Sequence, residues 1–153
     1  MKVKARKSCP EKLEVKMEPK VVDDPRGRGR MLIPRPLDVD ALMREIPKGK
    51  LATVGQIRDS LARKECADFT CPLTAGIFMR IAAGAAEEDL AKGKKKITPY
   101  WRVVKDDGSL NEKFPGGTYM QATRLKEEGH SILPGKGKKP PRVKDFEKAL
   151  HKL

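Results

Sequence analysis

Two adjacent aromatic residues, Tyr100 and Trp101, have the clearest potential for recognition chemistry in this sequence. Trp101 is the only tryptophan, Tyr100 is one of two tyrosines, and the basic run Lys92–Lys96 precedes them. Aromatic rings that line a pocket can stack on a nucleobase, which contributes about 1–3 kcal/mol per stacked base. The same rings can also fill a hydrophobic core. The sequence is compatible with both arrangements.

The other reactive side chains form no catalytic or metal-binding pattern. The three cysteines, Cys9, Cys66 and Cys71, are odd in number and lack the spacing of a zinc site. A tyrosine hydroxyl with a pKa of about 10 is protonated at neutral pH and is a poor nucleophile. Neither a motif with paired carboxylates nor a catalytic triad is evident. We therefore expect a protein that is not an enzyme and that needs neither a metal nor a cofactor.

The positive charge of the chain is concentrated at its two ends. The net charge is +13, yet residues 37–132 carry 16 Lys and Arg against 14 Asp and Glu. Residues 1–36 carry 11 against 5, and residues 133–153 carry 7 against 2. Basic ends are attracted to polyanions, and nucleic acid is the first expected partner. They can also be solvated tails without a partner.

The sequence favours a cytoplasmic protein that does not contact membranes. No apolar run approaches the roughly 18 residues of a membrane span. The basic start leads into no apolar segment of the kind found in secretory signals, and the cysteine usage is typical of a reducing compartment. We expect a monomer, associated with the nucleoid if the protein is bacterial.

Two short helices are predicted at the start of the central segment. Asp38 is a suitable N-cap for a helix that ends near Glu45. Thr53 and Gln56 match a capping box, in which each residue bonds the backbone N–H of the other, and this predicts a second helix to about Arg63.

A third helix is predicted to begin at Pro72, because proline suits the first helical turn. Leu73, Ile77 and Ile81 recur at helical spacing and are predicted to face the core. The other face carries mostly small residues, namely Gly76, Met79, Arg80 and Ala83. Such a face can pack tightly against another helix or approach a DNA groove. The order of the helices is that of a helix-turn-helix.

A β-hairpin over Trp101–Leu110 is predicted to follow as a wing, with Asp107-Gly108 in its turn. Thr118 then opens a helix that carries Tyr119, Ala122 and Leu125 on one face and ends at Gly129. The predicted fold is mainly α with a small β-hairpin wing, a winged helix-turn-helix-like domain with basic, partly disordered tails. We divide the chain into a basic extended or disordered segment (1–36), the winged helix domain (37–132), and a basic tail with a short helix (133–153).

The segment Pro25–Arg30 alternates Arg and Gly. Arginines spaced by glycine can lie along the narrow minor groove of A·T-rich DNA, because glycine lets the backbone approach the groove floor. The pattern is similar to the core of an AT-hook, although Gly29 replaces the usual proline. A flexible basic linker is the alternative reading.

Taken in order, these pieces resemble the C-terminal DNA-binding domain of the alkylguanine-DNA alkyltransferases. Ile46–Gln56 is similar to the family's Pro-x-Gly-x-x-x-Thr-Tyr-Gly segment. Thr98–Val104 resembles its active-site signature Ile-Pro-Cys-His-Arg-Val-Val. Asp107–Leu110, Phe114–Gly117 and Glu128-Gly129 follow with family-like spacing. The resemblance covers more than half of the chain.

The sequence departs from this family at its reactive positions. In the family, the signature Cys accepts an alkyl group from a flipped guanine, the next His relays a proton, and a later Glu orients that His. Here Tyr100 and Trp101 replace the Cys and the His, while Arg102 and Glu128 match the family. The resemblance therefore implies a protein that has lost alkyl transfer.

Two further family residues also differ. The family's tyrosine that rotates the target phosphate corresponds to Val54, and its intercalating arginine corresponds to about Gly76. Arg80, one turn later, is a hypothetical substitute for that arginine. Both departures concern residues that flip the target base in the family.

The resemblance extends to the alkyltransferase-like proteins, a branch that binds alkylated DNA without repairing it and marks it for excision repair. It implies double-stranded DNA, including DNA with an alkylated guanine, and excision-repair proteins as partners. The alternative is an interaction, structural or general DNA-binding protein that kept the fold and lost lesion recognition. The expected DNA contacts are Thr53, Val54, Gly55, Gln56, Gly76, Arg80, Arg102, Arg26, Arg28 and Arg30. The expected lesion pocket consists of Tyr100, Trp101, Gly116, Gly117 and Glu128.

Overall fold

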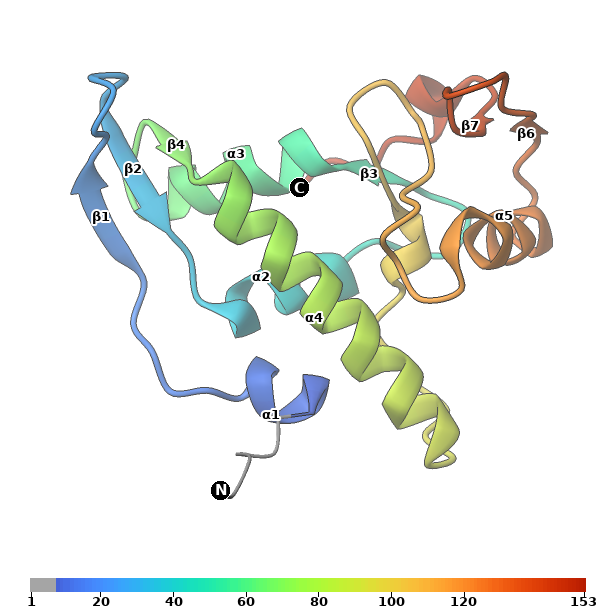
Figure 1. The fold of residues 1–153 in the computed structure, drawn as a ribbon, viewed down its shortest axis with the longest axis horizontal. Helices are drawn as coiled ribbons and strands as arrows, with labels where there is room; N and C mark the ends of the chain where they lie inside the picture. Colours follow the sequence, from blue (N-terminus) through green and yellow to red (C-terminus); the bar gives the residue numbers. More distant parts are fainter. Residues whose placement is uncertain (1–7) are drawn as a thin grey trace, which may run out of the picture.

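Three helices, α2 (Pro36–Arg44), α3 (Val54–Lys64) and α4 (Pro72–Ala91), build the centre of the molecule. In the computed structural model, which describes residues 8–153, α4 runs diagonally past α2 (Figure 1). The short strand β4 (Phe69–Thr70) lies between α3 and α4 in the sequence, so these two helices follow each other in helix-turn-helix order. The prediction of a mainly α domain of this type is confirmed.

The helices begin at capping residues and prolines. The hydroxyl of Thr53 accepts the Gln56 N–H at 3.1 Å, and Gln56 Oε1 accepts the Thr53 N–H at 2.9 Å, so the predicted capping box is confirmed. α4 begins at Pro72, as predicted. α2 begins at Pro36, earlier than predicted, because the ring already fixes φ near the helical value. Asp38 therefore lies in the first turn of α2 and does not cap it.

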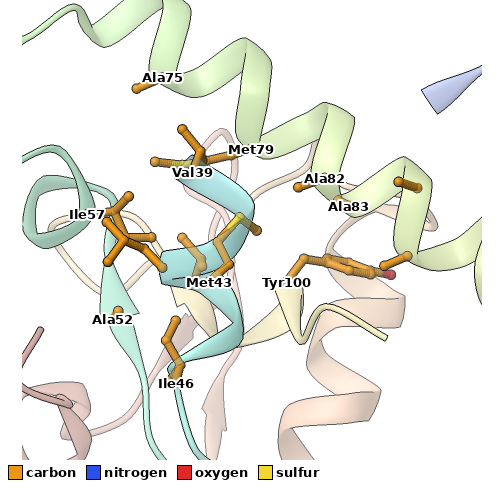
Figure 2. Close-up of a cluster of buried hydrophobic side chains, with 14 of the residues drawn as sticks. Val39, Met43, Ile46, Ala52, Ile57, Ala75, Met79, Ala82, Ala83 and Tyr100 are labelled. Carbon is orange, nitrogen blue, oxygen red and sulfur yellow. The ribbon is translucent and has the colours of Figure 1, made fainter. Parts of the chain in front are cut away.

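α4 turns mainly alanines towards the core, so the prediction is wrong for Leu73 and Ile77, whereas Ile81 packs against the core as predicted. Leu73 is 72% exposed and Ile77 is 36% exposed. The residues buried under α4 are Ala75, Met79, Ala82, Ala83, Ala85 and Ala86. Figure 2 shows Met79 close to Val39 of α2. The prediction failed because hydropathy alone favoured the larger side chains, whereas α1 (Cys9–Leu13) and α2 pack so close to α4 that alanine fits best.

The N-terminal segment is folded, so the expectation of an extended or disordered chain is wrong for residues 8–36; residues 1–7 lie outside the described part. β1 (Lys20–Asp23) and β2 (Arg30–Ile33) form an antiparallel hairpin, and β2 also pairs in parallel with β4. Leu13 and Leu32 belong to the main core. The sequence does contain a signal for this hairpin, because two short apolar runs lie on either side of a Pro-Arg-Gly turn.

The predicted wing over Trp101–Leu110 is wrong in its pairing. Residues 100–102 form the 3-10 helix η1 (Tyr100–Arg102), and β5 (Val103–Val104) pairs in parallel with β3 (Ala52–Thr53). The turn at Asp107-Gly108 exists, because Gly108 N–H donates to Lys105 O at 2.8 Å. The chain returns only as far as Lys105, whose N–H donates to Ser109 O at 2.9 Å, and Ser109 then bridges to Arg142. β5 therefore pairs with β3, which is distant in the sequence, and not with the segment that follows the turn.

The C-terminal segment is also part of the fold and not a tail. β6 (Ile132–Leu133) pairs with β7 (Arg142–Val143), and the 3-10 helix η2 (Phe146–Ala149) stands where an α-helix was predicted. Val143 and Phe146 join a second hydrophobic cluster with Leu51, Val104, Leu110 and Leu125. The His151 N–H donates to Leu51 O at 2.7 Å, which fixes the chain end beside β3.

α5 (Gly117–Glu127) buries one glutamine that the apolar pattern did not indicate. Gln121 has no exposed surface, donates to Val103 O at 2.9 Å, and accepts the Asn111 N–H at 2.8 Å. Leu125 is buried as predicted, but Tyr119 is 81% exposed and lies outside the packed face. A buried polar side chain with satisfied hydrogen bonds fixes how α5 sits on β5.

Candidate functional site: the signature segment and the outer face of α4

Tyr100 lies inside the main core and has no exposed surface. Its ring packs edge-on against Phe114, with 5.4 Å between the ring centroids, and Figure 2 shows it in the cluster with Ala82 and Ala83. Its hydroxyl donates to Glu87 of α4. Burial, and then this hydrogen bond, raise the pKa of Tyr100 above its ordinary value. The structure thus places Tyr100 in the core and corrects its assignment to an open lesion pocket.

Trp101 is half-buried, and its ring packs edge-on against Tyr100 with 5.4 Å between the ring centroids. Its indole Nε1 donates to Glu128 Oε2 at 3.1 Å. The guanidinium carbon of Arg124 lies 4.5 Å from the centroid of the indole ring, a cation–π distance. Arg124 also donates to Glu87 Oε1 at 2.6 Å, the same carboxylate that binds Tyr100. Both signature aromatics are therefore held by one network that joins α4, η1 and α5.

Arg102 serves the fold and is not free to contact DNA. Its guanidinium donates to Glu128 Oε1 at 2.9 Å and Oε2 at 2.7 Å, and to Ile46 O at 2.7 Å. The Arg102 and Glu128 side chains are 13% and 8% exposed. Burial alone would raise the pKa of Glu128, but the hydrogen bonds from Arg102 and Trp101 outweigh it and lower the pKa. Arg102 thus forms a buried ion pair with Glu128 in place of the expected DNA contact.

A groove of about 530 Å³, here called the Trp101 groove, opens between the end of α4 and α5. Its lining residues are Lys48, Leu90, Trp101, Met120, Thr123, Arg124, Glu127 and Glu128. Gly116 and Gly117 line neither this groove nor the one described next. They start α5 with positive φ values of 77° and 65°, which favour glycine. The five expected pocket residues are therefore not gathered into one cavity.

A second groove, of about 420 Å³, lies along the outer face of α4 and is here called the α4 groove. Its lining residues are Val54, Pro72, Leu73, Gly76, Met79, Arg80, Lys105, Asp106, Asn111, Glu112 and Lys113. A Cβ added at Gly76 would meet nothing within 4 Å, so the helix surface is open there. Three of the expected DNA contacts, Val54, Gly76 and Arg80, are thus brought together.

The other expected contacts in the first turn of α3 are occupied by internal hydrogen bonds. Thr53 is buried in the capping box. The Gly55 N–H donates to Asp106 Oδ1 at 2.7 Å, and Gln56 Nε2 donates to His151 O at 3.1 Å. Their roles here are to hold the loop after β5 and the end of the chain against α3.

Arg26, Arg28 and Arg30 lie at the tip of the β1–β2 hairpin and are exposed. An AT-hook needs a free, extended backbone, and this backbone is not free. The Arg28 N–H donates to Asp24 Oδ2 at 3.0 Å, and the Arg30 N–H donates to Asp68 Oδ2 at 2.8 Å. Both interpretations of the segment are therefore wrong, because the tip is neither an AT-hook nor a flexible linker.

Residues 8–153 contain neither a cluster of metal-ligating side chains nor a membrane-spanning helix. No group of three or more His, Cys, Asp or Glu side chains in that part of the chain is placed to hold a metal ion. Among the same residues, no helix has both the length and the apolar character needed to span a membrane.

Comparison with known proteins identifies the fold. No protein-family model matches the sequence, and no curated protein is significantly similar to it. A crystal structure of S. pombe Atl1 in complex with damaged DNA containing O6-carboxymethylguanine aligns with a TM-score of 0.51 and 21% identity. A structure of S. pombe ATL in complex with DNA aligns with a TM-score of 0.50 and 23% identity. Each alignment covers 77% of this chain and 94% of the other. This protein therefore has the fold of the alkyltransferase-like proteins.

Proposed function

We propose that this protein binds double-stranded DNA through the outer face of α4 and does not transfer alkyl groups. The observation that carries the proposal is the open face around Gly76, where Leu73 is 72% exposed and Arg80 is exposed. α4 is the second helix of a helix-turn-helix, the element that usually enters a DNA groove. The S. pombe protein of the same fold was solved in complex with DNA, which supports the choice of partner.

The absence of alkyl transfer follows from the chemistry at Tyr100 and Trp101. A buried phenol that donates to Glu87, with a pKa raised by burial, is protonated and has no path to an alkyl group. Trp101 stands at the position of the relay histidine and has no basic nitrogen, because the lone pair of the indole nitrogen belongs to the aromatic ring. The indole N–H donates to Glu128. The protein would bind DNA without changing it.

The α4 groove is the proposed site for an alkylated guanine. It lies where the helix face is open, and Val54, Leu73 and Met79 are the apolar side chains among its lining residues that could contact an alkyl group. The S. pombe complex with O6-carboxymethylguanine supports this ligand class. Excision-repair proteins are then the expected protein partners, by the resemblance described above.

A second candidate function is general DNA binding without lesion recognition. The observation that favours it is the burial of Tyr100 and Phe114, which are 0% and 2% exposed and fill the interior behind the signature segment. In that case α4 would still meet DNA, but the signature segment would offer no cavity for a flipped base.

Substitutions at Gly76 test the proposed DNA-binding face without disturbing the core. Because the site is open and helical, Gly76→Ala should be tolerated or slightly stabilising. Gly76→Glu adds a negative charge to the face and should weaken binding to a duplex roughly tenfold or more, about 1.4 kcal/mol per tenfold. Gly76→Arg should strengthen it.

The measurement is fluorescence anisotropy with a labelled duplex at fixed salt. Ser131→Glu is the matched control, because it adds the same charge at an exposed position after α5. Equal affinities of the Gly76→Glu, Ser131→Glu and unaltered proteins would show that DNA does not meet α4.

A further inference from the structure

The tip of the β1–β2 hairpin is a rigid, positively charged element. The turn is closed by two backbone hydrogen bonds, Asp24 N–H to Gly29 O at 2.8 Å and Gly27 N–H to Asp24 O at 2.9 Å. Gly27 and Gly29 have φ values of 74° and 117°, a region that favours glycine, so their positions in the turn are set by the backbone.

Asp24 organises this turn from inside. Its carboxylate is buried and accepts the Arg28 N–H at 3.0 Å, Arg28 Nε at 2.7 Å and Arg28 Nη2 at 3.3 Å. These bonds to Arg28 lower the pKa of Asp24 to about 2, so the carboxylate is charged at neutral pH. The guanidinium of Arg28 also lies 5.1 Å from the centroid of the Phe69 ring. Arg28 is thus a structural residue of the tip.

Strand pairing fixes the tip relative to the start of α4. Met31 and Leu32 of β2 pair in parallel with Phe69 and Thr70 of β4. The Cys71 N–H, at the N-cap of α4, donates to Leu32 O at 2.8 Å. Figure 1 shows the hairpin at the end of the molecule where α4 begins. The hairpin therefore lies beside the first turn of α4.

Arg26 and Arg30 are the side chains that this tip leaves available. Both residues are exposed, and neither side chain forms an ion pair within residues 8–153, where the carboxylate of Asp24 is taken by Arg28. The Asp68 carboxylate accepts the Arg30 backbone N–H, so it does not neutralise the Arg30 guanidinium through a direct contact. Each of these guanidinium groups can bind phosphate oxygens with paired hydrogen bonds.

We propose that the β1–β2 hairpin is a second DNA contact, in which Arg26 and Arg30 bind backbone phosphates beside the groove that α4 enters. This inference rests on the proposed DNA binding by α4 and adds to it a part of the chain that the sequence pattern placed outside the folded domain. The hairpin acts as the wing of the domain, in place of the segment 101–110. It positions the protein on the duplex and reads no base.

The salt dependence of DNA binding tests this proposal on the full chain. Each phosphate contact contributes about 0.9 to the slope of log K against log salt concentration, so Arg26→Ala/Arg30→Ala should reduce the slope by roughly 2. The matched control is Lys136→Ala/Lys138→Ala, which removes the same charge from the exposed loop between β6 and β7. The control should keep a slope close to that of the unaltered protein, and circular dichroism should show that both variants are folded.

The outcomes separate the hairpin from the proposed function. A reduced slope in the Arg26/Arg30 variant alone supports the hairpin contact. Equal slopes in all three proteins would overturn it while leaving DNA binding by α4 intact. Equal losses in both double variants would also overturn it, because total charge and not the tip would then control affinity. Failure of the unaltered protein to bind a duplex would remove the proposed function and the hairpin contact together.

Discussion

Replacing Glu128 by alanine is expected to lower the free energy of unfolding by about 3–5 kcal/mol, because it leaves a buried guanidinium without its counter-ion. Arg102 is only 13% exposed and would keep a single strong acceptor, Ile46 O. Trp101 would lose its acceptor in the same change. Urea denaturation measures the effect.

Glu112→Ala is the matched control for this ion pair. Glu112 lies 3.2 Å from Lys105, but the two side chains are 57% and 40% exposed. An exposed pair contributes about 0–1 kcal/mol, so the control should be close to neutral. If Glu128→Ala were as mild as Glu112→Ala, the buried pair would not hold η1 to the end of α5 as described.

The ion pair of Glu128 should also make the stability of the protein depend on pH in the acid range. The pKa of Glu128 is lowered in the folded protein from the ordinary value of 4.5. Its contribution is therefore present above that value and is lost as the pH falls through the folded pKa. Glu128→Gln keeps the shape and removes this titration, so its loss of stability in acid should be smaller than that of the unaltered protein. Identical acid profiles would contradict the assignment.

Tyr100→Ala is expected to be comparably severe, at about 3–5 kcal/mol, because it removes a fully buried aromatic ring from the main core. Tyr100→Phe keeps the ring and removes only the hydrogen bond to Glu87, which should cost roughly 0.5–1.5 kcal/mol. A fully stable Tyr100→Ala protein would show that the ring occupies an open pocket after all.

Alkaline titration gives a second readout for Tyr100. The pKa is raised in the folded protein, so the contribution to stability is fully present below the ordinary value of 10.0 and is lost as the pH rises towards the folded pKa. In a Tyr119→Phe background, Tyr100 is the only phenol of the chain. Its ultraviolet difference absorbance should then change at a higher pH than that of free tyrosine. Titration at the ordinary value would contradict burial.

The elements with local signals were predictable from the sequence. The capping box at Thr53 and Gln56 and the proline at residue 72 each set a helix start through contacts within one turn. The face of α4 was not predictable, because close packing against α1 and α2 selected alanines over Leu73 and Ile77. Side-chain volume at a contact between helices depends on the partner helix, which hydropathy does not contain.

The residues of the site that belong to the family-like motifs were predictable from the sequence. The residues that distant helices bring to them were not. Resemblance to the alkyltransferase signature singled out Tyr100, Trp101 and Glu128, and the structure does bring Trp101 and Glu128 into contact. Glu87 and Arg124 were missed, although they bind Tyr100 and stack on Trp101. Their sequence neighbourhoods are ordinary charged helix surface, so no local signal distinguishes them.

We propose that this protein binds DNA although Tyr100 stands where the alkyltransferases have their acceptor cysteine. The most direct measurement compares affinities for two duplexes of identical sequence, one with a single O6-alkylguanine, at near-physiological salt, with mass spectrometry of the protein afterwards. We expect binding to both duplexes, tighter binding to the alkylated one, and an unchanged protein mass. Equal binding would select the general DNA-binding alternative. Binding to neither duplex, or a protein that gained the alkyl group, would contradict the proposed function.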